Sequence, residues 1–272
     1  MAGWSEGDVQ ANGITVHYQR TGGNNKLSIL LLHGITDNGL CWSRVAHDLE
    51  GSHNVIMTDA RGHGRSDGIA TGFSINILAD DAAAVIRALD LEKPFLFGHS
   101  MGAITAATVA AQYPELVRAI VLEDPPLVDK PPTQTNAEQQ GQQAWQWVVD
   151  LKALPHEERL ARAFAMNPNW VEEEIIPWAD SKAEFNTDVL EHATAFRSYP
   201  WREIISRIEC PILLITGDPE LHAIVTPEVA QEAAQIWKHG EVVHISGAGH
   251  NIHRDRYDET MAAVRAFLNR ER

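Results

Sequence analysis

The chain has 272 residues and a formal net charge of −15, from 37 acidic and 22 basic side chains. Such a charge repels nucleic acid and anionic lipid, and no run of about eighteen apolar residues is present, so neither a nucleic-acid-binding nor a membrane-bound protein is expected. Two cysteines are too few for a four-ligand zinc site, and the thirteen histidines lack the spacing of metal ligands, so no metal or other cofactor is predicted.

Apolar runs alternate with helical patterns along most of the chain. Residues 8–11 and 14–19 flank the pair Asn12-Gly13 and predict an opening β-hairpin. A buried strand is predicted at residues 28–32, and further strands at residues 55–58, 95–97, 119–122, 212–216 and 242–245. Helices are predicted at residues 74–89, 100–112 and 255–268. This alternation is typical of an α/β protein, in which helices cover both faces of a mostly parallel sheet.

Residues 127–200 interrupt the alternation, because their helical patterns continue without a buried strand. We predict that this segment is a helical cap inserted into a core made by residues 1–126 and 201–272. It is rich in tryptophan, at Trp145, Trp147, Trp170 and Trp178. These side chains either pack the cap onto the core or line a site for an apolar substrate, and for the second role the candidates are Trp145, Trp170 and Trp178.

A candidate nucleophile lies in Gly98-His99-Ser100-Met101-Gly102, which follows a predicted strand and opens a predicted helix. A serine on such a sharp turn has a strained backbone, and the residues two before and two after it must be small. The N-terminus of the helix directs backbone N–H groups and a positive dipole at the same place. The motif therefore predicts Ser100 as a nucleophile and the N–H of Met101 as an oxyanion donor.

His250 is the candidate general base. It follows the last predicted strand in a glycine-rich loop, where a flexible backbone can bring the imidazole to the nucleophile. Three other histidines are weaker candidates. His99 is expected to point away from the nucleophile, His63 lies in a predicted turn, and His253 belongs to the following helix.

Four segments together resemble the α/β-hydrolase superfamily, and the resemblance covers nearly the whole chain: His33-Gly34, the turn from Asp59 to Ser66, the serine motif, and Gly249-His250. It implies an eight-stranded sheet, a cap inserted after the sixth strand and a serine-histidine-acid triad. By the same resemblance, the N–H of Ile35 would be the second oxyanion donor. A serine at position 100 disfavours those relatives whose nucleophile is an aspartate, the haloalkane dehalogenases and epoxide hydrolases.

The resemblance leaves the acid of the triad open. In some relatives it follows the sixth strand, 24 residues after the nucleophile, which is the position of Asp124. In others it follows the seventh strand in a turn that corresponds here to Gly217-Asp218-Pro219-Glu220, so Asp218 and Glu220 are alternatives. We favour Asp124.

A nucleophile, a base and two oxyanion donors predict attack on a carbonyl carbon through an acyl-enzyme. We predict a hydrolase that cleaves a carboxylic ester or lactone of a bulky, apolar small molecule, and the acidic balance leaves room for an amine-bearing substrate such as a macrolide-like lactone. One alternative is a carbon–carbon bond hydrolase of the same fold. Another is a slow-turnover small-molecule receptor whose cap movement recruits a protein. The first residues lack the features of a secretory signal, so a cytoplasmic location is expected. We also expect a monomer or a homodimer.

Overall fold

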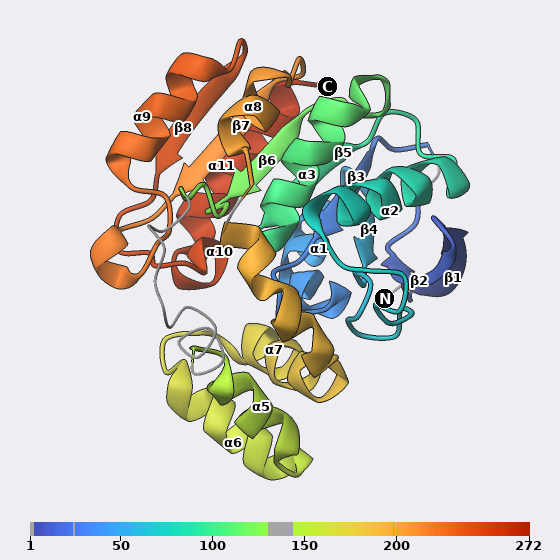
Figure 1. Cartoon of the computed structure of the whole chain (residues 1–272), viewed down its shortest axis with the longest axis vertical. Helices are drawn as coiled ribbons and strands as arrows, with labels where there is room; N and C mark the ends of the chain where they lie inside the picture. The colour runs from blue at the N-terminus through green and yellow to red at the C-terminus, as the bar shows by residue number, and fades with distance from the viewer. Residues whose placement is uncertain (1–2, 24, 130–143, 198) are drawn as a thin grey trace.

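A computed structural model describes residues 3–23, 25–129, 144–197 and 199–272 (Figure 1). In this part of the chain, eight strands form one sheet in the order β1-β2-β4-β3-β5-β6-β7-β8. The strands are β1 (Ser5–Ala11), β2 (Ile14–Arg20), β3 (Ser28–Leu32), β4 (Asn54–Thr58), β5 (Phe95–His99), β6 (Ile120–Glu123), β7 (Ile212–Thr216) and β8 (Gly240–His244).

The first two strands form the predicted hairpin. Ala11 pairs with Ile14, and the turn residues Asn12 and Gly13 have φ values of 48° and 78°, as a two-residue turn between twisted strands requires. Strand β2 is also antiparallel to β4, whereas all pairs from β4–β3 to β7–β8 are parallel. The mostly parallel sheet predicted from the sequence is therefore confirmed.

Helices lie on both faces of this sheet (Figure 1). The helices are α1 (Ser43–Leu49), α2 (Ile75–Ala88), α3 (Met101–Gln112), α5 (Gln146–Ala153), α6 (His156–Met166), α7 (Glu172–Glu184), α8 (Trp201–Ser206), α9 (Pro227–Ile236), α10 (Ile252–Asp255) and α11 (Tyr257–Arg270). Short 3-10 helices are η1 (Gly39–Trp42), η2 (Pro114–Leu116), η3 (Thr187–Arg197) and η4 (Pro219–Leu221). No helix among the described residues has the length and apolar character needed to span a membrane.

Alternate residues of the central strands pack on opposite faces. In β3, Leu30 and Leu32 belong to the apolar cluster that contains α2, α3, α8 and α9, whereas Ile29 and Leu31 belong to the cluster that contains α1 and α11. Because successive side chains of a strand point to opposite sides, a strand covered on both faces must be apolar throughout. This is why the inner strands were recognisable as continuous apolar runs.

Helices α5, α6 and α7 lie beyond one end of the sheet (Figure 1). They share a small apolar cluster that includes Leu151, Ala163 and Trp178 and that reaches the core at Cys41 of η1. They come from the segment predicted as an inserted cap, between β6 and β7. Residues 130–143 and 198 of that segment lie outside the described residues.

Candidate active site

Ser100 occupies the tight turn between β5 and α3. Its φ of 53° and ψ of −114° are rarely adopted by residues other than glycine, so the backbone is strained at this position. The flanking glycines allow the turn to form. A Cβ on Gly98 would overlap the carbonyl of Gly102, and a Cβ on Gly102 would overlap the carbonyl of Leu32 in the neighbouring strand. The turn therefore holds the Ser100 side chain at the carboxyl end of the central strands.

The structure brings Ser100, His250 and Asp124 together in a hydrogen-bonded row. The Nε2 atom of His250 lies 3.0 Å from the Oγ atom of Ser100, and its Nδ1 atom lies 2.6 Å from the Oδ2 atom of Asp124. Because a carboxylate only accepts, Nδ1 carries the ring proton and Nε2 is free to accept the proton of Ser100. Asp124 is fully buried, and the N–H groups of Ile224 and Val225 also donate to it. Its orientation is thus set by the backbone.

The two alternative acids lie elsewhere. Asp218 accepts a hydrogen bond from the N–H of Gly247 at 2.7 Å and pairs with Nε2 of His244 at 2.9 Å. It therefore ties the turn after β7 to the loop that leads to His250. Glu220 is exposed in η4. Of the three candidates, it is Asp124 that contacts His250.

The peptide unit between Gly34 and Ile35 is fixed by His33. The Nε2 atom of His33 accepts from the N–H of Ala60 at 2.9 Å, so Nδ1 carries the proton and donates to the carbonyl of Gly34 at 2.8 Å. Burial lowers the pKa of His33 to about 3, which keeps this ring neutral. Because a trans peptide is planar, a fixed Gly34 carbonyl directs the N–H of Ile35 to the opposite side. Gly34, Ile35, Ser100 and Met101 line one cavity.

The N–H of Met101 belongs to the first turn of α3, where backbone donors have no partner within the helix. Together with the amide of Ile35, it is placed to donate to an oxygen bound above Ser100. The first turn also directs the positive end of the helix dipole to this place. The arrangement can therefore stabilise negative charge that develops on a carbonyl oxygen during attack.

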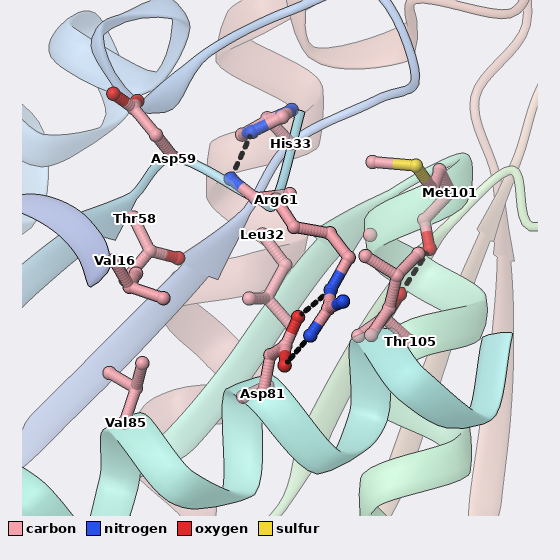
Figure 2. Close-up of a pocket in the computed structure, with 14 residues that line it drawn as sticks. Val16, Leu32, His33, Thr58, Asp59, Arg61, Asp81, Val85, Met101 and Thr105 are labelled. Carbon is pink, nitrogen blue, oxygen red and sulfur yellow. Dashed lines mark hydrogen bonds and ion pairs between the residues drawn. The ribbon is translucent and has the colours of Figure 1, made fainter. Parts of the chain in front are cut away.

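A buried ion pair lies next to His33 and holds the turn that follows β4 (Figure 2). The guanidinium of Arg61 forms a bidentate pair with the carboxylate of Asp81 in α2, and both side chains are buried. Arg61 follows Ala60, whose N–H holds His33, and the cavity between these groups measures only about 30 Å³. A space of this size takes no substrate, so the cluster serves to position the turn.

His99 does not point away from the site, contrary to the prediction. Its Nε2 atom lies 2.9 Å from the carbonyl oxygen of His250, and the two rings lie 4.8 Å apart between centroids. Burial lowers the pKa of His99 to about 3, so the ring is neutral and Nε2–H donates to that carbonyl. His99, which precedes the nucleophile, therefore fixes the backbone at His250. No periodic pattern indicates this contact, because it joins residues 151 positions apart.

A second buried pair, Glu123 and His253, holds the same loop from the other side. The backbone N–H and Nδ1 of His253 both lie within 2.9 Å of the Glu123 carboxylate, and the His253 ring stacks on Trp42. Glu123 immediately precedes Asp124, and His253 lies three residues after His250. The pair therefore fixes the distance between the base and its acid.

Substituting Glu123 by glutamine is expected to remove a pH-dependent part of the stability. Burial alone would raise the pKa of Glu123, but the charge and hydrogen bonds of His253 outweigh it and lower the pKa to about 2. Because this lies below the unfolded-state value, the carboxylate stabilises the fold above about pH 4.5, and the contribution is lost as the pH falls towards 2. Urea titrations should show that the free energy of unfolding falls more for the wild type than for Glu123→Gln over this range, by on the order of 3 kcal/mol. If the free energy of unfolding falls equally in both proteins, the Glu123 carboxylate does not make this contribution.

A cluster of buried charges joins α7 to the loop after β3. The Nζ atom of Lys182 donates to the carbonyl of Thr36 and to Asp37, each at 2.8 Å. Arg254 of α10 donates to the other oxygen of Asp37 at 2.8 Å. Burial alone would raise the pKa of Asp37, but the two cations outweigh it and hold the pKa well below its usual range. One carboxylate thus links α7, the oxyanion loop and the helix that follows the base.

Replacing Lys182 by methionine is expected to lower the free energy of unfolding by about 3–5 kcal/mol, because it leaves part of a buried ion pair without its partner. The turnover number should fall as well, since Thr36 lies next to Ile35. Urea unfolding and steady-state kinetics measure the two effects. Lys238→Met is the matched control, because Lys238 is exposed and its carboxylate partner is 3.9 Å away. If both variants lose the same stability, the cluster does not have this role.

The cavity above Ser100 has a volume of about 520 Å³. Its apolar wall is formed by Pro126, Trp145, Trp147, Met166, Trp170 and Trp178. Three of these tryptophans also pack on one another: Trp147 stacks on Trp178 at 5.7 Å, and Trp170 meets Trp178 edge-on at 5.8 Å. Trp145 and Trp147 also pack against the main apolar core, so packing and cavity lining occur together, and a role of the tryptophans in substrate binding stays a prediction. No arginine or lysine lines the cavity in the part of the chain that the structure describes.

A model of the α/β-hydrolase fold family matches residues 28–257. The chain belongs to this family. Among curated proteins, it is 28% identical to the N-formylmaleamate deformylase of Pseudomonas putida, over 97% of this chain and 96% of that protein. It is 26% identical to the (E)-2-((N-methylformamido)methylene)succinate hydrolase of Acinetobacter baylyi, over 95% of each protein.

Solved structures agree with this assignment. The crystal structure of an E-2-(acetamidomethylene)succinate hydrolase superimposes with a TM-score of 0.80 at 25% identity, over 98% of this chain and 100% of the other. The enol-lactonase of Burkholderia xenovorans shares the fold with a TM-score of 0.75 at 22% identity, over 97% of this chain and 100% of the other. The predicted family is confirmed and a hydrolase is supported. The predicted ester bond is not confirmed, because the full-length curated relatives are named for other substrates.

Proposed function

We propose that the chain is a serine-dependent hydrolase that cleaves an amide-type or carbon–carbon bond beside a carbonyl group of a small molecule. The observation that carries the proposal is the hydrogen-bonded row of Ser100, His250 and Asp124 at the floor of a cavity. The full-length relatives are named for an N-formyl compound and an acylaminomethylene succinate, and they support a carbon–carbon or amide-type hydrolase better than the ester hydrolase predicted from the sequence.

In the proposed reaction, His250 accepts the Ser100 proton as Oγ attacks the carbonyl carbon, and Asp124 stabilises the imidazolium that forms. The amides of Ile35 and Met101 donate to the resulting oxyanion; donors of this kind contribute about 10²–10³-fold each in rate. Collapse of the intermediate breaks the bond to the leaving group, which takes the proton from His250. Water, deprotonated by His250, then releases the acid and restores Ser100.

The two bond types differ in what the leaving group needs. An amine leaves once its nitrogen takes the proton from His250. A carbon leaving group departs with an electron pair, which the substrate itself must delocalise into a neighbouring carbonyl as an enolate before the carbon is protonated. Among substrates with carbon–carbon bonds, we therefore expect turnover only where a second carbonyl lies next to the bond that breaks.

The walls of the cavity favour an acyl group that is apolar and uncharged. Four tryptophans and Met166 line it, and the described lining residues include no arginine or lysine that could pair with a carboxylate. An apolar, uncharged acyl group differs from the maleamate and succinate compounds for which the relatives are named. We propose that helices α5–α7 act as a cap that closes over such an acyl group.

The proposal is tested with one arylacyl group presented as an amide, a 1,3-diketone, an ester and a thioester. We expect the largest rate enhancement over the uncatalysed reaction for the amide or the diketone. An enhancement confined to the ester and thioester would instead favour the ester hydrolase predicted from the sequence. Tight binding of all four compounds without turnover would favour a receptor.

A further inference from the structure

We propose that the substrate binds in a single orientation, with its apolar acyl group beneath Trp147 and Trp178 and a neutral or cationic, amine-bearing leaving group at the opposite end, beside Asp255. This inference rests on the proposed function, because it assumes that Ser100 attacks a carbonyl carbon. It assigns chemistry to a second, polar hollow beside His250, whose other lining residues belong neither to the triad nor to the oxyanion donors.

The acyl end lies over the oxyanion loop. The Nζ atom of Lys182 donates to the carbonyl of Thr36 at 2.8 Å and lies 4.4 Å from the ring centroid of Trp178. Trp178 is therefore held above the residue that follows Ile35, and Trp147 stacks on it with an interplanar angle of 6°. The two rings form an apolar wall at the side of the cavity that carries the oxyanion donors.

The opposite end lies beside the base. The indole N–H of Trp170 donates to Oδ1 of Asp255 at 2.8 Å, and Oδ2 of Asp255 accepts from the N–H of Gly249 at 2.8 Å. Gly249 precedes His250, so Asp255 lies where the base loop runs, and Trp170 lies between Asp255 and Trp178, 5.8 Å from the Trp178 ring. Asp255 is exposed and lines a second hollow at this end, so its carboxylate is accessible there.

At this end the cavity continues into a second hollow of about 380 Å³. The two share the residues Met166, Asn167, Trp170, His222, His250 and Asn251. The second hollow adds Asn169 and the carboxylate of Asp255, and its described lining contains no arginine or lysine. Amide, imidazole and carboxylate groups suit a hydrogen-bonding group that is neutral or positively charged, whereas an anion would be repelled.

The chemistry of the triad sets the direction. A leaving group must lie within reach of the imidazole that protonates it, and His250 lines both hollows. The oxyanion must lie at Ile35 and Met101. With those two positions assigned, the remaining substituent of the tetrahedral carbon, the acyl chain, points into the tryptophan-lined cavity.

The test uses arylacyl amides with leaving groups of equal length: 1,2-diaminoethane, propylamine and glycine, which are cationic, neutral and anionic. For the wild type, we expect kcat/KM to fall in that order, by about two- to fivefold a step, the range of a solvent-exposed ion pair. In Asp255→Asn, the ratio between the cationic and anionic amides should shrink towards one. Because ratios are compared within each variant, a general loss of activity cancels.

Asp258→Asn is the matched control, since Asp258 is an exposed acid on the next helix that lines neither hollow, and its ratio should equal that of the wild type. Ser100→Ala separates the two proposals. Turnover that does not depend on Ser100, or no turnover of any amide or diketone, overturns the proposed function. Turnover that depends on Ser100 but prefers the anionic amide, or keeps its ratio in Asp255→Asn, overturns the orientation alone.

Discussion

Replacing Ser100 by alanine is expected to lower kcat by about 10⁴–10⁶-fold for every substrate that the protein hydrolyses. The substitution removes the Oγ atom that lies 3.0 Å from His250, so no acyl-enzyme can form. The cavity and both oxyanion donors remain, so the substrate should still bind with nearly unchanged affinity. Steady-state kinetics and equilibrium binding measure the two quantities separately.

Ser206→Ala is the control for this experiment. The hydroxyl of Ser206 donates to the carbonyl of Glu203 on an exposed turn of α8, far along the chain from the triad, and its loss should leave kcat within about twofold of the wild type. Circular dichroism should show that both variants are folded. A Ser100→Ala variant that keeps more than about a tenth of the wild-type kcat would mean that Ser100 is not the nucleophile.

Asp124→Asn is expected to lower kcat by about 10⁴-fold, because the substitution selects the wrong imidazole tautomer. The N–H of Val225 donates to Oδ1 of Asp124, and the N–H of Ile224 is shared between Oδ1 and Oδ2. Because Oδ1 meets both donors, we expect an asparagine to keep its oxygen there and turn its NH₂ group towards His250. The Nδ1 atom must then accept, which places the ring proton on Nε2. That nitrogen can no longer take the proton of Ser100.

Asp218→Asn is the matched comparison. Asp218 follows the neighbouring strand and holds Gly247, but it does not contact His250, so we expect a loss of kcat of less than about tenfold from a looser base loop. Glu220→Gln should change kcat by less than about twofold, since its side chain is exposed. A larger loss for Asp218→Asn than for Asp124→Asn would assign the acid to β7 instead of β6. The pH dependence of kcat in each variant gives a second readout of the imidazole.

Local patterns were sufficient to predict the sheet and the nucleophile. The inner strands begin and end within about two residues of the predicted ranges, because a strand buried on both faces is a continuous apolar run. The turn at Ser100 requires glycines at Gly98 and Gly102, so its geometry is readable from five consecutive residues. The N-cap of α2 is also local, because the Ser74 hydroxyl accepts from the N–H of Ile77. The closing helix was predicted at residues 255–268 and is found as α11, Tyr257–Arg270, after the separate short helix α10 that ends at Asp255.

The tertiary structure decided which polar side chains meet. Asp124 and Asp218 both follow parallel strands of the same sheet, and the sequence favoured Asp124 only through a family resemblance. The φ of 42° at Asp124 and the amides of Ile224 and Val225, about a hundred residues away, determine that its carboxylate faces His250. The contact between Lys182 and Asp37, which lie 145 residues apart, likewise depends on the tertiary structure. Periodicity records only the conformation of neighbouring residues, whereas such contacts depend on how loops from separate strands pack together.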